Sequence, residues 1–231
     1  MSISRPDGRC PVVKILKPMK LAKILCITNS IMLLSVLSCP VSAQQLVQEH
    51  YEDGQLKTEG KMLEGRKSGN WRYYFPDGSL NAVENYREGL LHGEVRYYDF
   101  EGRLEAVEQW EAGLQEDSSF YYYPNGQLEK KGVFGDGLYQ GKWLFFYEDG
   151  KPKRIGIYKD GLPDGAWTFY QEDGDLLQEG SFKNGQEHGN WKFYNEKGKL
   201  EYIGQYTYGE RSGQWYYVDK RGRKEEIDIE Q

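Results

Sequence analysis

Cysteine is scarce in this chain and confined to one end of it. The three cysteines, Cys10, Cys26 and Cys39, all lie within the first 43 of the 231 residues. Residues 44–231 therefore contain no disulfide and no thiolate metal site that could hold their fold together. The stability of this part has to come from the packing of its own elements.

The chain also lacks an excess of positive charge. It has 30 Lys and Arg against 36 Asp and Glu, and residues 1–43 hold six of the basic residues but one acidic residue. Residues 44–231 thus carry 24 basic and 35 acidic residues, a net charge of −11. Nucleic acids and anionic membranes bind through basic patches, so the composition excludes nucleic acid as a partner and disfavours peripheral membrane association.

Long hydrophobic runs are absent except for one mildly apolar stretch, residues 24–37, which follows Lys20 and Lys23. At about 14 residues it is too short to span a bilayer. Small residues then lead to Ala43 and Gln44, as at a secretory cleavage site. We expect residues 1–43 to be a signal peptide cleaved between Ala43 and Gln44, which predicts export to the periplasm, the cell envelope or the medium.

Two alternatives for this segment stay open. The residues before Cys39 are similar to a bacterial lipobox, which would make Cys39 a lipidated N-terminus, although Leu37 departs from the usual small or β-branched residue. The long lead before Met19 is unusual for a signal peptide, so translation from Met19 is the other alternative.

Glycine, by contrast, is abundant and strictly spaced. The chain has 28 glycines, and two sets of them recur every 24 residues without exception. A fixed period of this length is the signature of a repeat array. The first set is Gly54, Gly78, Gly102, Gly126, Gly150, Gly174, Gly198 and Gly222; the second is Gly65, Gly89, Gly113, Gly137, Gly161, Gly185 and Gly209.

Asp or Asn precedes many of these glycines, and such pairs supply the positive φ that tight hairpin turns need. Each repeat therefore has two turns and two strands. Strand-favouring aromatics without helical periodicity predict an all-β fold: an elongated, twisted antiparallel sheet of about eight tandem hairpins over residues 44–231, with a charged C-terminal cap.

Aromatic residues recur with the same period. Side chains alternate between the faces of a strand, so the tryptophans occupy one face and a second aromatic set occupies the other. We expect five of the six tryptophans, Trp71, Trp143, Trp167, Trp191 and Trp215, which share one repeat position, to be structural together with the repeat glycines. The second set, called here the aromatic ladder, is the candidate binding surface and comprises Tyr74, Tyr98, Tyr122, Phe146, Tyr170 and Tyr194.

No constellation for catalysis is evident. His92 and His188 occupy the same position of repeats that are four periods apart, too far to share a proton or a metal ion. The carboxylates before the glycines recur in turns and are explained by turn formation. The sequence predicts no enzyme, no metal site and no cofactor.

The pattern from Tyr158 and Gly161 through Gly165, Trp167, Phe169, Tyr170 and Gly174 to Leu176 resembles the MORN (membrane occupation and recognition nexus) repeat, in the bacterial variant form found in exported or antitoxin-annotated proteins. The resemblance covers residues 45–224 and implies the hairpin-array fold. It also implies a scaffold rather than an enzyme.

The predicted function is a non-catalytic exported scaffold that binds another protein through an extended sheet surface. Two alternatives follow from the same features. One is an antitoxin or immunity protein that neutralises a cognate toxin. The other is an envelope glycan-binding module, because a row of Tyr rings can stack on sugars.

Overall fold

The computed structural model describes residues 44–228, which belong to one unit of the chain, residues 41–231. The predictions for residues 1–43 lie outside the described residues. Residues 44–228 include no helix that is long and apolar enough to cross a membrane. Nineteen strands make up the described part: β1 (Gln44–His50), β2 (Leu56–Leu63), β3 (Arg66–Tyr74), β4 (Leu80–Arg87), β5 (Leu90–Leu91), β6 (Gly93–Tyr98), β7 (Leu104–Glu111), β8 (Leu114–Gln115), β9 (Asp117–Tyr122), β10 (Leu128–Gly135), β11 (Leu138–Phe146), β12 (Pro152–Lys159), β13 (Leu162–Tyr170), β14 (Leu176–Lys183), β15 (Gln186–Glu187), β16 (Gly189–Tyr194), β17 (Leu200–Thr207), β18 (Glu210–Val218) and β19 (Lys224–Ile227).

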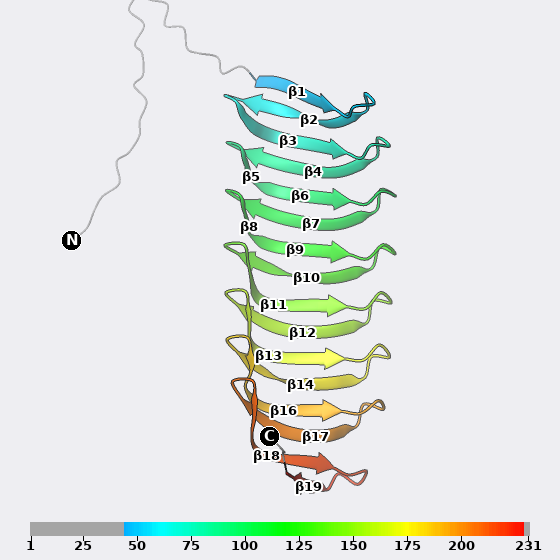
Figure 1. Cartoon of the computed structure of the whole chain (residues 1–231), viewed down its shortest axis with the longest axis vertical. Helices are drawn as coiled ribbons and strands as arrows, with labels where there is room; N and C mark the ends of the chain where they lie inside the picture. Colours follow the sequence, from blue (N-terminus) through cyan, green and yellow to red (C-terminus); the bar gives the residue numbers. More distant parts are fainter. Residues whose placement is uncertain (1–43, 229–231) are drawn as a thin grey trace, which may run out of the picture. The chain divides into compact units, whose positions relative to one another are not determined.

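The strands form one open antiparallel sheet in which most strands pair with their neighbours in sequence, as β11 does with β10 and β12. The two-residue strands β5, β8 and β15 pair only with the strand before them, which also pairs with the strand after them. Figure 1 shows the hairpins stacked in chain order, with β1 at one end and β19 at the other. The strands keep nearly the same direction from end to end of the stack (Figure 1). The predicted all-β array of tandem hairpins is confirmed.

The glycine set that contains Gly161 forms the tight turns along one edge of the sheet. Both central residues of such a turn have positive φ, for example 50° at Asp160 and 80° at Gly161, as type I′ hairpin turns require. The Gly161 N–H then donates to the Tyr139 carbonyl of the preceding repeat at 3.0 Å. Neighbouring repeats are thus joined along this edge as well as through the sheet.

The glycine set that contains Gly78 forms longer loops along the other edge, and here the glycine carries the positive φ while the preceding residue does not. The preceding Asp or Asn instead accepts a hydrogen bond from the N–H just after the glycine, as Asp77 Oδ1 does from Ser79 at 2.9 Å. Where that residue is Glu101, Lys197 or Arg221, the acceptor moves to Asp99, Asn195 or Asp219 at the start of the loop. All eight loops are closed by a side-chain oxygen in one of these two ways.

The core lies on the face of the sheet that holds the tryptophans, called here the inner face. Five of the six indoles, all but that of Trp110, each cover a glycine that lies 11 residues earlier, and a Cβ at Gly156 would stand 2.1 Å from Trp167. The Trp167 Nε1–H donates to the Ile157 carbonyl at 3.1 Å, beside that glycine. The five tryptophans are 0–4% exposed, and the pairs are Gly60–Trp71, Gly132–Trp143, Gly156–Trp167, Gly180–Trp191 and Gly204–Trp215.

At two places in the array, the glycine–tryptophan pair is replaced by a different pair of residues. Val95 and Ser119 stand where the tryptophan is expected, and Glu84 and Glu108 stand where the glycine is expected. Ser119 is 0% exposed, so this small side chain lies in the core. Glu108 fills the space that an indole would take and accepts hydrogen bonds from Tyr121 Oη at 2.8 Å and Trp110 Nε1 at 3.0 Å.

Candidate interaction surface

The aromatic ladder lies on the face opposite the tryptophans, called here the outer face, close to the edge formed by the longer loops. All six ladder residues are half-buried. The two end residues are held by carboxylates of the preceding repeat, because Tyr74 Oη donates to Glu59 Oε1 and Tyr194 Oη donates to Glu179 Oε1, both at 2.9 Å. The ladder rings therefore lie against the sheet and present part of their surface to solvent.

The two carboxylates that hold the ladder are charged at neutral pH. The Tyr74 hydroxyl keeps the pKa of Glu59 below its ordinary value, and the hydrogen bond from Lys192 does the same for the pKa of Glu179. Burial and the neighbouring carboxylate raise the pKa of Tyr74 and of Tyr194 above the usual range. Both tyrosines thus remain hydrogen-bond donors at any physiological pH.

A second row of outer-face side chains runs beside the ladder along the middle of the strands. Paired residues of neighbouring strands share a face, so the register places these side chains in one line. We call it the central row: Gln48, Glu59, Arg72, Val83, Arg96, Val107, Phe120, Lys131, Leu144, Ile155, Thr168, Glu179, Lys192, Ile203, Tyr216 and Glu226.

The middle of the central row is largely apolar and its two ends carry charge pairs. The apolar members are half-buried: Val83, Val107, Phe120, Leu144 and Ile155. On one side of them Arg72 pairs with Glu59 at 3.6 Å, and on the other Lys192 pairs with Glu179 at 2.8 Å. Val133 and Ile157 continue the apolar area next to the row, where they are 40% and 41% exposed.

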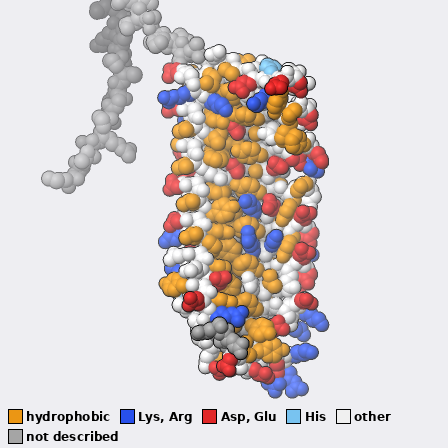
Figure 2. Space-filling model, in the orientation of Figure 1, with side chains coloured by type: hydrophobic (Ala, Val, Ile, Leu, Met, Phe, Trp, Pro, Cys, Tyr) orange, Lys and Arg blue, Asp and Glu red, His pale blue; other side chains and the backbone are white. Residues whose placement is uncertain are grey.

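The edges of the array differ from its middle. Figure 2 shows the inner face, on which hydrophobic side chains follow the middle of the array from end to end, while acidic side chains gather along both edges. On the outer face, the apolar area is the one formed by the central row and the residues beside it.

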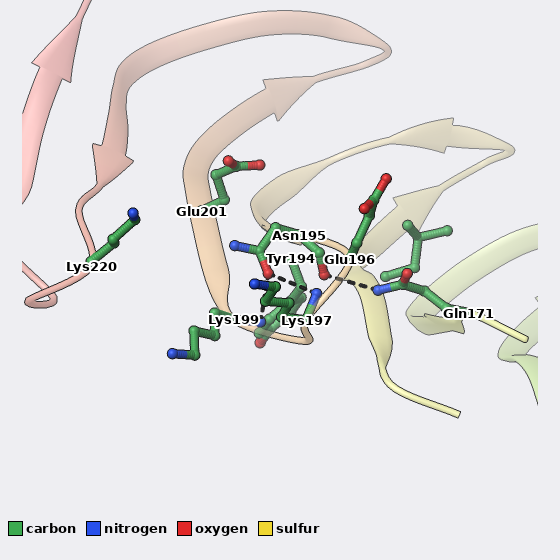
Figure 3. Close-up of a pocket in the computed structure, with 9 residues that line it drawn as sticks. Gln171, Tyr194, Asn195, Glu196, Lys197, Lys199, Glu201 and Lys220 are labelled. Atoms are coloured by element: carbon green, nitrogen blue, oxygen red, sulfur yellow. Dashed lines mark hydrogen bonds between the residues drawn. The ribbon is translucent and has the colours of Figure 1, made fainter. Parts of the chain in front are cut away.

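A polar hollow of about 710 Å³ opens at the end of the ladder, between the loops of the last repeats. It is lined by Tyr194, Gln171 and Asn195, by three lysines and by two glutamates. Figure 3 shows Lys197 and Lys199 extending beside Asn195, while Lys220 comes from the next loop. The hollow places no acid–base pair around a shared reacting position, and we assign it no chemistry.

No group of three or more His, Cys, Asp or Glu side chains within residues 44–228 is arranged to hold a metal ion. Of the histidines considered above, His188 lies with its ring 4.8 Å from that of Tyr208. The His92 N–H donates to the Asn85 carbonyl at 2.8 Å, as the His188 N–H does to Ser181.

With this geometry in view, the family model described as MORN repeat variant matches residues 67–88, 118–136, 139–160, 163–184 and 187–208. This chain is a MORN-repeat protein. The matches leave out residues 89–117, where Val95 and Glu108 replace tryptophan and glycine. The MORN fold nevertheless continues through them, because β6 and β7 pair in the same register as their counterparts β16 and β17. MORN-repeat proteins are repeat scaffolds, commonly for protein interaction, and are generally non-enzymatic.

No curated protein matches this chain. Among solved structures it is similar to the GtfA/B complex bound to UDP and GlcNAc, at 13% identity over 50% of this chain and 22% of that chain, with a TM-score of 0.23. It is also similar to a porin-like protein from Bacteroides uniformis, at 9% identity over 79% of this chain and 92% of that chain, with a TM-score of 0.19. This chain spans less than a quarter of the first structure, and neither TM-score is high enough to support an argument.

The central row was not among the residues singled out from the sequence, although the ladder was. Each member lies either one residue after the tryptophan position or one residue before the glycine position that pairs with it. The residue type at these positions varies from Arg to Phe. Repeat positions that keep one residue type stand out in a single sequence, whereas a variable position does not. Strand alternation applied to the residue after each tryptophan would have found half of the row.

Proposed function

We propose that this MORN-repeat protein is a non-catalytic scaffold that is exported and binds protein through the outer face of its sheet. The observation that carries the proposal is the apolar stretch of the central row beside the half-buried aromatic ladder, bounded by charge pairs at both ends. Half-exposed aromatic and aliphatic side chains with a charged rim suit a protein partner, because Tyr and Phe bury large areas at low entropic cost.

A site-specific photo-crosslinker tests the surface in intact cells. We would place it at Thr168 of the central row and, as a matched control, at Lys183, which is exposed near the tight-turn edge. Protein adducts from position 168 and few from position 183 are expected. Equal adducts from both positions, or none from position 168, would rule out the outer face as the binding surface.

Export is tested separately by sequencing the N-terminus of the protein recovered from fractionated cells. We expect a chain that begins at Gln44 outside the cytoplasm. A lipidated chain that begins at Cys39 would move the scaffold to a membrane surface. An uncleaved chain in the cytoplasm would exclude export and favour the antitoxin alternative.

A further inference from the structure

The charged residues of the central row are complementary to the same row of a second copy that runs in the opposite direction. Glu59 and Arg72 lie near one end in the order acidic, basic, and Glu179 and Lys192 lie near the other end in the same order. When one copy is turned end over end, Glu59 comes opposite Lys192 and Arg72 comes opposite Glu179. Each end then forms a cluster of two acidic and two basic side chains.

From this pattern we propose that the outer face binds a second copy of the chain, face to face and antiparallel. The two-fold axis would run parallel to the strands between Phe120 and Lys131, at equal distances from the two charge pairs. This inference rests on the proposed function, since it names a second copy of the chain as the protein that the outer face binds. It fits the isologous interfaces of most homodimers, in which one patch meets itself.

The residues between the charge clusters are compatible with the same axis. Val107 would lie opposite Leu144 of the second copy and Val83 opposite Thr168. Phe120 would lie opposite Lys131 and Arg96 opposite Ile155, where the aliphatic stems of the two basic side chains can pack against the apolar groups while Arg96 keeps its ion pair with Glu94. No member of the row between Glu59 and Lys192 faces a residue of like charge. The other two-fold arrangement, with the copies parallel, sets Glu59 against Glu59 and Arg72 against Arg72, and like charges in contact are costly.

The shape of the sheet supports contact over this length. From Glu59 to Lys192 the row crosses eleven strand spacings of about 4.8 Å, roughly 50 Å in all. Most sheets twist by about 20° per strand, which would separate two stacked sheets over such a distance, and flat sheets are usually stabilised by stacking. Figure 1 shows strands that keep almost one direction along the array, so two outer faces can stay in register.

A charge-swap experiment on the full chain tests the dimer. Arg72→Glu with Lys192→Glu makes all four end charges negative, and Glu59→Lys with Glu179→Lys makes them all positive. We expect the wild type to sediment as a dimer, each variant alone to show a dissociation constant raised on the order of tenfold or more, and an equal mixture of the two variants to form the heterodimer. Recovery in the mixture also shows that both variants are folded.

The control carries the same change in net charge away from the row, Lys197→Glu with Lys220→Glu in the exposed loops, and should leave the dimer unchanged. A monomeric wild type, variants that dimerise as well as the wild type, or a mixture that stays monomeric would each overturn the dimer. A monomeric wild type that still gives crosslinks from position 168 to a different protein would remove the dimer and keep the proposed function. If the wild type is monomeric and position 168 gives no crosslinks, both the dimer and the proposed function are excluded.

Discussion

At the scale of single residues, the decisive contact is between each of the five repeat tryptophans and the glycine beneath it. The indole lies where a Cβ would otherwise be, 2.1–2.2 Å from the ring atoms in all five pairs. Because protein interiors are close-packed, the two residues have to change together. Glu84 with Val95 and Glu108 with Ser119 show the alternative solution within the same chain.

Gly156→Ala should therefore destabilise the array by about 1–3 kcal/mol, since the new methyl group overlaps Trp167. Adding Trp167→Val should make the combined loss smaller than the sum of the two single losses, because the overlap is then removed. Urea denaturation measures both. The control is Gly135→Ala, which meets the flexible Gln140 side chain at 3.2 Å and should have little effect; additive losses in the double variant would contradict the pairing.

The sequence made the tryptophan and glycine positions easy to recognise, but it did not indicate that they touch. The contact depends on a shift in strand register at the glycine, as between Gly156 and Tyr158. Alternation along a strand predicts the face on which a side chain lies, and it does not predict such an irregularity. The glycine that each tryptophan contacts can be identified only from the pairing of the strands.

At the scale of the element, the longer loops depend on carboxylates that close them. A hydrogen bond from the Ser79 side chain lowers the pKa of Asp77, one from Lys151 lowers the pKa of Asp149, and the Arg223 N–H lowers the pKa of Asp219. A lowered folded-state pKa adds stability that is fully present above the unfolded value of about 3.9 and is lost as pH falls through the folded value.

The thermal midpoint should consequently be constant from pH 7 to about 5 and fall below about pH 4. Asp77→Asn together with Asp149→Asn should reduce this fall while the loops stay closed, because Asn125 already fills the same role with a 2.8 Å bond from the Gln127 N–H. Thermal unfolding at several pH values measures the effect. An unchanged acid dependence in this variant would show that other carboxylates cause it.

The hairpins themselves were predictable, because turn residues and strand-forming aromatics recur at every repeat. The breaks in three of the strands were not. β5 and β6 are separated at His92, β8 and β9 at Glu116, and β15 and β16 at His188. In the other repeats the corresponding strand is continuous, as in β11, and the local sequences give no plain signal for the difference.

At the scale of the whole molecule, each repeat pairs with its neighbours only, so the array should tolerate the loss of a complete repeat. Deleting residues 141–164 leaves Gly132 eleven positions before Trp167 and preserves a compatible pair. Deleting residues 117–140 removes the same length but places Glu108 eleven positions before Trp143. We expect the first deletion to keep a cooperative thermal transition and the second to lose it or to melt far lower.

Circular dichroism and thermal unfolding of the two deletions decide this. Similar stability of both would show that neighbouring repeats combine freely. Failure of the first deletion would show that the array depends on contacts beyond adjacent repeats.

The pairing across repeats also bears on how such a gene can change its length. Unequal recombination between two repeats of the glycine–tryptophan type adds or removes 24 codons and yields a chain that still packs. A crossover that joins the Glu84 or Glu108 segment to a tryptophan repeat places a carboxylate under an indole. The stretch from Glu84 to Ser119 can therefore be lost or duplicated only as a whole, whereas the glycine–tryptophan repeats can be gained or lost one at a time.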